Sequence, residues 1–312
     1  MIRRLLSMTG YLLYTLLVLI ILLWWKFPAA TVKTWLEQQL NSRSPGYVWK
    51  IESLKPVLPD HIRLTGISVI PVQRQKQQKQ TMPLLHVEQL DLIPDPVRIL
   101  SKSKLIRYRM RLFSGTGEGR LVSSSNFHSV EWNGRFEKLQ IKQMKALRTS
   151  LRRKLTGTVT GDFSWQGDLQ QKGKTQISGR VVIVDGILPF RKPILGMTSL
   201  PYTKIETGCI YQGGKWLLKK GKLISTRLTA TFSGRIDPAG TIASSGLQLN
   251  GVLTPRSELF SGNGRQQMAG MIRSFLKDGG LAFTVSGTAA EPGINFANGL
   301  SRAMDRLQGN RR

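Results

Sequence analysis

Strict alternation of apolar and polar side chains is the feature of this sequence that most constrains its fold. The segment IRYRMRL, residues 106–112, alternates throughout. A period of two places alternate side chains on opposite faces of a β-strand. The segment therefore predicts a strand with a basic face and an apolar face. The basic set is Arg107, Arg109 and Arg111, and the apolar set is Ile106, Tyr108, Met110 and Leu112.

The same alternation recurs in four later segments, LTGTVTGDFSWQG, RLTATFSGRI, GLQLNGVL and LAFTVSGT. Glycine-rich turns separate several of these segments. Regularly spaced strands of this kind predict an antiparallel sheet with one apolar and one polar face. With residues 106, 108 and 110, the candidate apolar face comprises Val159, Phe163, Leu228, Phe232, Leu249 and Phe283.

An uncharged, mostly apolar stretch from Leu5 to Trp25 precedes the strands. Its 21 residues would reach roughly 30 Å as a helix, which is the thickness of a bilayer's hydrocarbon core. No A-x-A-like cleavage site follows it, and Trp24 and Trp25 suit the membrane interface. We expect a retained transmembrane helix, and the alternatives are a cleaved signal peptide and a buried core helix.

The orientation of this helix follows from the short basic tail that precedes it, which holds Arg3 and Arg4. The positive-inside rule keeps such a tail in the cytoplasm, whereas long domains cross largely regardless of charge. The bulk of the chain is therefore expected outside the cytoplasm, in the periplasm of a bacterium with two membranes. The expected division is a cytoplasmic tail (1–4), a transmembrane helix (5–25), a connecting helix (26–41), a β-rich periplasmic domain (42–297) and a polar tail (298–312).

The chain is strongly basic, with 46 lysines and arginines against 18 acids and a formal net charge of +28. Anionic lipid head groups are attracted to such a surface, and so is nucleic acid. The basic clusters lack the interleaved aromatic side chains that single-strand nucleic-acid binders use, so no nucleic-acid partner is expected. The segment QMKALRTSLRRKL predicts a basic amphipathic helix that either caps the sheet or lies on a membrane, and its basic side chains include Arg148, Arg152 and Arg153.

Residues for catalysis or metal binding are sparse. The three histidines stand apart from one another, and Cys209 is the only cysteine. The acidic residues are scattered, and GTGEG lacks the Gly-Lys-Ser/Thr ending of a phosphate-binding loop. We therefore expect a non-enzyme without a metal or other cofactor.

The apolar face of the expected sheet needs a cover. Either it closes into a β-sandwich core, or it forms an open groove that binds acyl chains, with basic residues at its rim. Both arrangements require the same alternation, so the two alternatives stay open.

The order of these segments resembles that of the AsmA-like family. The resemblance begins with the anchor, the segment FPAATVKTWLEQQL and the segment YVWKIESLKPVLPDHIRLTGISVI. It continues through the Gly-terminated strands LTGTVTGDFSWQG, ISGRVVIVDGIL, LTATFSGRI, LQLNGVL and GLAFTVSGTAAEP. At this length the chain is most similar to the GspN branch, found in type II secretion systems.

The resemblance implies a curved or sandwich-like antiparallel β-sheet with a few short helices, held in the periplasm by a single-pass inner-membrane anchor. It implies an accessory role in a type II protein secretion system, with inner-membrane components of that system as partners. The alternative function is a lipid-binding or lipid-transfer module. The inner membrane and anionic phospholipid are the other expected partners.

Overall fold

A computed structural model describes residues 10, 11, 14, 15, 18, 22, 26–57, 60–72, 83–99, 101–124, 129–168, 175–261, 270, 272, 274–276 and 279–297. These residues are mainly β, as the alternation predicts, and fifteen strands join in one antiparallel sheet. The expected mainly β fold is confirmed, and the strands form one sheet rather than the two packed sheets of a sandwich.

The first half of the sheet comprises β1 (Tyr47–Lys50), β2 (Ser53–Val57), β3 (His61–Pro71), β4 (Leu85–Pro94), β5 (Ser103–Leu112), β6 (Gly115–Ser124), β7 (Ser129–Gln140) and β8 (Thr158–Asp168). The second half comprises β9 (Gln176–Ile194), β10 (Met197–Gln212), β11 (Lys215–Ile224), β12 (Leu228–Asp237), β13 (Gly246–Pro255), β14 (Leu281–Gly287) and β15 (Pro292–Phe296). The short helices are α2 (Ala29–Arg43), α3 (Pro96–Ile99), η1 (Ile141–Gln143), α4 (Lys145–Leu151) and η3 (Ser257–Leu259).

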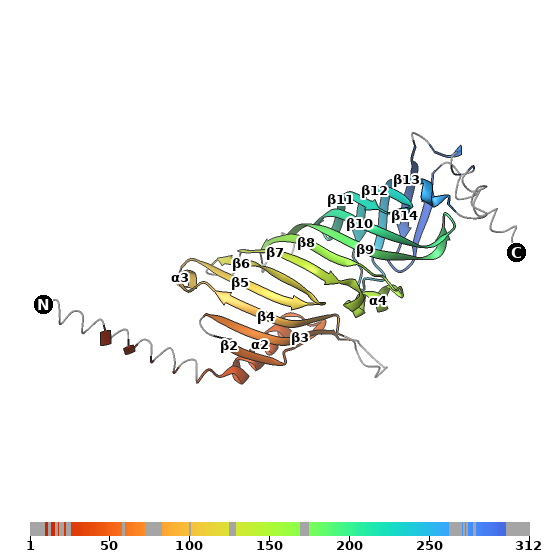
Figure 1. The fold of residues 1–312 in the computed structure, drawn as a ribbon. Helices are drawn as coiled ribbons and strands as arrows, with labels where there is room; N and C mark the ends of the chain where they lie inside the picture. The colour runs from red at the N-terminus through yellow and green to blue at the C-terminus, as the bar shows by residue number, and fades with distance from the viewer. Residues whose placement is uncertain are drawn as a thin grey trace.

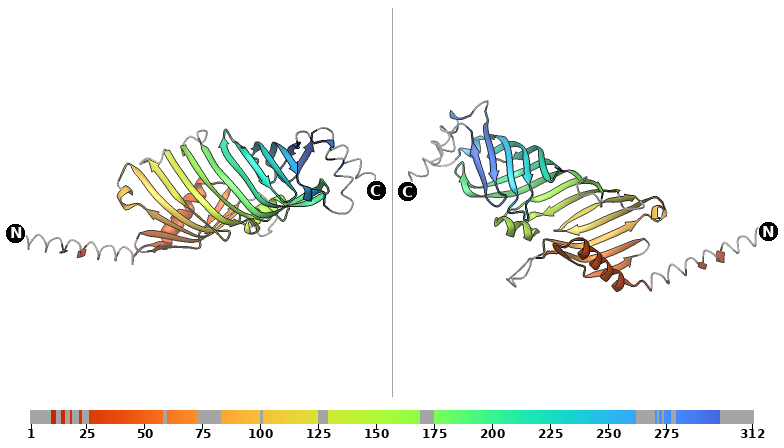
Figure 2. Two further views of the ribbon diagram at one scale, coloured as in Figure 1. Left: turned by 45° about the horizontal axis from the view of Figure 1, so that its top comes forward. Right: turned by 180° about the vertical axis from the view of Figure 1, so that it is seen from behind.

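The sheet is a meander, because from β3 onward each strand pairs with the next one along the chain. Strands β1 and β2 share the outer edge of β3, β2 along its first half and β1 along its second. Figures 1 and 2 show a single, strongly twisted layer of strands, with α2 at one end and β13–β15 at the other.

Tight two-residue turns join several of the hairpins. The turn between β5 and β6 is Phe113–Ser114, and the one between β10 and β11 is Gly213–Gly214. All four residues have positive φ, which matches the right-handed twist of the strands on either side. These turns fix the register and so decide which side chains meet across the sheet.

Helix α2 covers the first edge of the sheet. The side chains of Asn41 and Glu37 accept hydrogen bonds from the backbone N–H groups of Trp49 (2.7 Å) and Ile51 (2.6 Å). An uncovered edge strand would offer these groups to other chains. Helix α2 occupies most of the segment expected as a connecting helix (26–41), but it begins three residues later and ends two residues later.

Buried side chains form two separate clusters that pack against the sheet. The first lies under α2 and includes Leu54, Leu64 and Leu139. The second includes Leu195, Leu259 and Leu281, contributed by the β9–β10 turn, by η3 and by β14. The first cluster extends across the sheet to Leu139 on β7 and Val159 on β8, and the second begins at Leu188 on β9.

No helix among the described residues is both long and apolar enough to cross a membrane. Most of the expected transmembrane segment, including Leu5, Trp24 and Trp25, lies outside the described residues. The expected loop at 72–82 and the polar tail at 298–312 also fall outside them, apart from Val72. The basic helix predicted at 143–155 is shorter, because α4 ends at Leu151 and Arg152 adopts left-handed backbone geometry.

Candidate functional site

Apolar side chains from successive strands form rows across the middle of the sheet. One row runs from Tyr108 on β5 through Gly119 and Gly134 to Phe163 on β8, and each residue lies opposite the next. A parallel row passes through Leu121, Trp132, Trp165, Ile177, Tyr211 and Trp216. We call these two rows the central apolar face.

Aromatic rings contact one another along this face. Trp132 meets Tyr108 and Phe163 edge to face, with ring centroids 6.1 and 5.0 Å apart. Tyr211 and Trp216 form a second pair at 5.1 Å. Trp132 is 39% exposed although it lies in the middle of the aromatic contacts. A rigid aromatic surface of this kind suits flexible apolar ligands.

No described helix or strand lies over the central apolar face. The main contacts of α2 are with β1 and β2 and those of α3 are with β5, while the main strand contacts join neighbours within the sheet. Trp132, Phe163 and Trp165 belong to neither buried cluster. Within the described part of the chain, these three aromatic side chains therefore form a partly exposed surface outside both clusters.

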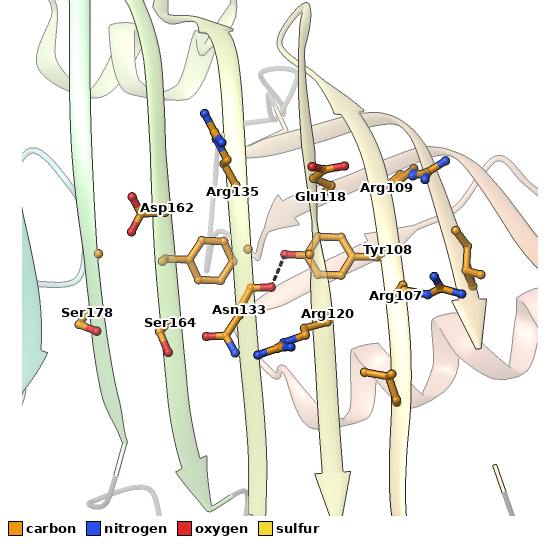
Figure 3. A pocket seen from close by; sticks show the side chains of 16 residues that line it. Arg107, Tyr108, Arg109, Glu118, Arg120, Asn133, Arg135, Asp162, Ser164 and Ser178 are labelled. Carbon is orange, nitrogen blue, oxygen red and sulfur yellow. Dashed lines mark hydrogen bonds between the residues drawn. The ribbon is translucent and has the colours of Figure 1, made fainter. Parts of the chain in front are cut away.

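The polar face carries a hollow of about 920 Å³ over β4 to β9, and its lining also includes Tyr108 and Phe163 from the row of the central apolar face. The side chains of Arg107, Arg109, Arg120 and Arg135 line it together with only two acids, Glu118 and Asp162 (Figure 3). The surplus is two positive charges. A smaller hollow of about 600 Å³ adjoins it and shares Arg109, Glu118 and Arg135 with it.

Opposite charges alternate across this polar face. From β3 to β9 each residue lies opposite the next in the order Arg63, Asp91, Arg109, Glu118, Arg135, Asp162 and Arg180. We call this row the charge ladder. Opposite charges across a strand pair stabilise it, so the ladder helps to specify the register.

The ends of the charge ladder are closed by direct ion pairs. Arg63 Nε donates to Asp91 Oδ1 at 2.7 Å, and Arg180 pairs with Glu206. Burial alone would raise the pKa of Asp91, but hydrogen bonds from Arg63 and Gln89 outweigh it and lower that pKa. Hydrogen bonds from Lys204 and Arg180 likewise lower the pKa of Glu206.

The structure separates the predicted apolar residues into different surroundings. Tyr108, Phe163 and Leu249 lie in one row of the sheet, whereas Leu228 is in the second buried cluster. Met110 and Val159 pack against the first cluster, and Phe283 packs against the second. Ile106 and Phe232 lie on the same apolar side as their strand neighbours Tyr108 and Leu228.

The predicted basic residues do not form one surface. Arg107, Arg109 and Arg111 are exposed on the polar face of β5, as the alternation predicts. Arg148 lies on α4, and Arg152 follows the helix. Arg153 is half-buried, and its guanidinium donates to the carbonyl of Ala290 at 2.9 Å.

Several residues of these two faces escape sequence reasoning. Trp132 and Arg120 lie in segments whose pairing becomes visible only once the register is known. The GTGEG segment, considered as a phosphate loop, is the start of β6. The relevant signal is the two-residue turn at Phe113–Ser114, which aligns β6 with the recognisable strand β5.

Within the described residues, no three His, Cys, Asp or Glu side chains come together in a group that could hold a metal ion. Cys209 lies on β10 opposite Gly179, in the row of Tyr108 and Phe163. Burial raises the pKa of its thiol.

Comparison with protein-family models, with curated proteins and with solved structures finds no significant match to this chain.

Proposed function

We propose that this chain is a non-catalytic, membrane-anchored protein whose β-sheet holds lipid acyl chains against its central apolar face. The observation that carries the proposal is the group of aromatic contacts around Trp132, which stays 39% exposed and lies outside both buried clusters. An exposed apolar patch of a soluble domain commonly marks a site for a ligand or a membrane. Acyl chains fit because the central apolar face offers apolar surface and few polar groups to orient a compact ligand.

The proposal includes the anchor and the location expected from the sequence. The uncharged run Leu5–Trp25 is long enough to span a bilayer, and Arg3 and Arg4 favour a cytoplasmic N-terminus. The β-sheet would then lie in the periplasm and meet lipid at the inner membrane. Protease added to spheroplasts should digest the β-sheet domain, and complete protection would place that domain in the cytoplasm.

Lipid binding is tested on the full chain purified in mild detergent. A photoreactive fatty acid should cross-link to β5–β10, and the Phe163→Asp variant should lose most of that cross-linking. Ser164→Asp is the matched control, because it adds the same charge at the next residue on the opposite face. Equal labelling of both variants, or labelling confined to other strands, would show that the central apolar face does not hold acyl chains.

A second candidate function is an accessory subunit of a type II secretion system. It is supported by the resemblance in strand order to GspN, and the quoted Gly-terminated segments do include the neighbouring strands β8, β9, β12, β13 and β14. The two functions are compatible, since a secretion subunit can also hold lipid. Inner-membrane components of the secretion system should co-purify with the full chain, and their absence from a clean purification would count against this role.

A further inference from the structure

Two arginines face one another on the polar side of the sheet. Arg107 on β5 lies directly opposite Arg120 on β6. Both side chains are exposed, and neither has an acidic group within 4.0 Å among the described residues. The adjacent position of the same strand pair is occupied by Arg109 and Glu118 of the charge ladder. The Arg107–Arg120 pair is thus a break in a pattern of alternating charge.

Like charges placed directly opposite one another destabilise a strand pair, so this arrangement has a cost in the absence of an anion. Figure 3 shows the two guanidinium groups turned apart, that of Arg107 towards β4 and that of Arg120 towards Asn133. Glu118 lies two residues from Arg120, but it faces Arg109 and Arg135 across its own row. Glu118 therefore does not offset the positive charge of the Arg107–Arg120 pair.

Hydroxyl groups continue the row of this arginine pair. Asn133 lies opposite Arg120, Ser164 opposite Asn133, and Ser178 opposite Ser164. The amide of Asn133 already donates to Glu131 at 2.6 Å. The hydroxyls of Ser164 and Ser178 have no hydrogen-bond partner among the described residues, and all five side chains line the 920 Å³ hollow.

We propose that this hollow binds a phosphate group held by Arg107 and Arg120, while Ser164 and Ser178, two and three strands beyond Arg120 in the same row, line the part of the hollow that would hold the rest of a phosphorylated molecule. Guanidinium groups match phosphate oxygens with paired, charge-assisted hydrogen bonds. The hollow is larger than one phosphate needs, so it has room for the rest of a phosphorylated molecule. The phosphate comes either from a lipid head group or from a soluble phosphate compound.

This site is independent of the proposed acyl-chain function. It lies on the opposite face of the sheet from the central apolar face, as the alternation of Tyr108 with Arg107 and Arg109 shows. An acyl chain on the central apolar face cannot carry its own head group through the sheet to Arg120. Loss of phosphate binding and loss of acyl-chain cross-linking are therefore separate outcomes.

The test measures the thermal unfolding of the full chain in detergent. Inorganic phosphate should raise the unfolding temperature saturably, and more than sodium chloride at the same ionic strength does. Arg120→Gln should weaken the apparent phosphate affinity about tenfold to a hundredfold. The same variant should unfold at an equal or higher temperature than the parent without phosphate, because it removes the like-charge contact.

Arg235→Gln is the matched control, since Arg235 is an exposed polar-face arginine that already pairs with Asp237 at 3.4 Å. It should keep the full response to phosphate. Arg107→Gln provides a second variant if Arg120→Gln does not fold. A response to chloride as large as that to phosphate would overturn the proposal, and so would an unchanged phosphate response in the arginine-pair variants.

Two further ligands separate the sources of the phosphate. Short-chain phosphatidylglycerol that competes with inorganic phosphate, and loses its effect in Arg120→Gln, would identify a lipid head group. Competition by glycerol phosphate without any effect of phosphatidylglycerol would identify a soluble phosphate compound. Short-chain diacylglycerol, which carries no phosphate, is the control for lipid that binds through its acyl chains alone, and its effect should survive the Arg120→Gln change.

Discussion

Phe163 on β8 lies opposite Gly134 on β7, and its ring occupies the space that a side chain at position 134 would need. A β-carbon added to Gly134 would be 2.7 Å from a ring carbon of Phe163 and 2.1 Å from the hydroxyl of Tyr108. The side chains of Tyr108 and Phe163 thus both occupy the space beside Gly134. The flat part of the central apolar face depends on this glycine.

Replacing Gly134 with valine should destabilise the domain by about 1–3 kcal/mol, because it overpacks a close contact between ring and backbone. The denaturation midpoint of the full chain in guanidinium chloride measures the change. Gly208→Ala is the control, since its added β-carbon would meet nothing nearer than 3.5 Å. Equal stability of Gly134→Val and the parent would show that the rings move aside freely.

The Arg63–Asp91 pair predicts a loss of stability in acid. The pKa of Asp91 is lowered in the folded protein, so its carboxylate binds protons more readily when the chain is unfolded. Its contribution to folding is therefore present above the ordinary carboxyl pKa of 3.8 and is lost as the pH falls through the lowered folded value. Asp91→Asn should be less stable than the parent at pH 7, and this difference should shrink at pH 2–3.

The control for this prediction is Asp95→Asn. The side chain of Asp95 accepts hydrogen bonds from the backbone N–H groups of Val97 and Arg98 at the start of α3, and it forms no ion pair with an arginine side chain among the described residues. Unfolding midpoints measured from pH 7 to pH 2 decide the matter. A constant difference between Asp91→Asn and the parent across that range would assign the loss to packing instead of charge.

The alternation of side chains predicted the strands with the clearest period of two. Strands β5, β8, β12 and β14 match their segments within a few residues. Long strands such as β9 and β10 are harder to predict from alternation, because β9 contains Pro189 and also Asp185, which has a positive φ. The local pattern indicates which face of the sheet a side chain occupies. Only the pairing of the strands shows which residues lie beside it.

The candidate site shows the same limit. The polar face of Arg107 follows from its own strand, whereas its position opposite Arg120 requires the register of β5 and β6. Whether the apolar face would close on itself was equally beyond the sequence, because a sandwich and an open trough need the same alternation. In the structure the strands form one continuous, twisted sheet with α2 at its edge, and not two packed sheets.

Cys209 is a native reporter for the central apolar face. Burial raises the pKa of its thiol, so less of the reactive thiolate is present at neutral pH. Iodoacetamide should react with the folded chain more slowly at pH 7.5 than with the urea-unfolded chain. A fatty acid bound on the central apolar face should slow the reaction further, because Cys209 lies in the row of Tyr108 and Phe163.

Mass spectrometry of the intact chain measures this labelling. The Phe163→Asp variant tests whether the protection needs the proposed site, and Ser164→Asp again serves as its control. Fatty acid should protect Cys209 in the parent and in Ser164→Asp but not in Phe163→Asp. Protection that persists in Phe163→Asp would place the fatty acid elsewhere.

Arg153 ties the segment after α4 to a turn 137 residues further along the chain. Its guanidinium donates to the carbonyl of Ala290 at 2.9 Å, beside the ion pair between Arg191 and Glu291. Burial, together with the nearby charge of Arg191, lowers the pKa of Arg153. Arg153 therefore helps to hold the β14–β15 turn against the rest of the sheet.

Arg153→Met keeps most of the aliphatic stem and removes the donor, so it should destabilise the domain by about 1–3 kcal/mol. Arg152→Met removes the same charge from the exposed neighbouring residue and should change stability by less than about 0.5 kcal/mol. Hydrogen exchange should rise at residues 288–291 in Arg153→Met alone. Equal effects of the two variants would indicate that both arginines act only through the net charge of the chain. The hydrogen bond from Arg153 to Ala290 would then contribute nothing to the stability of this end of the sheet.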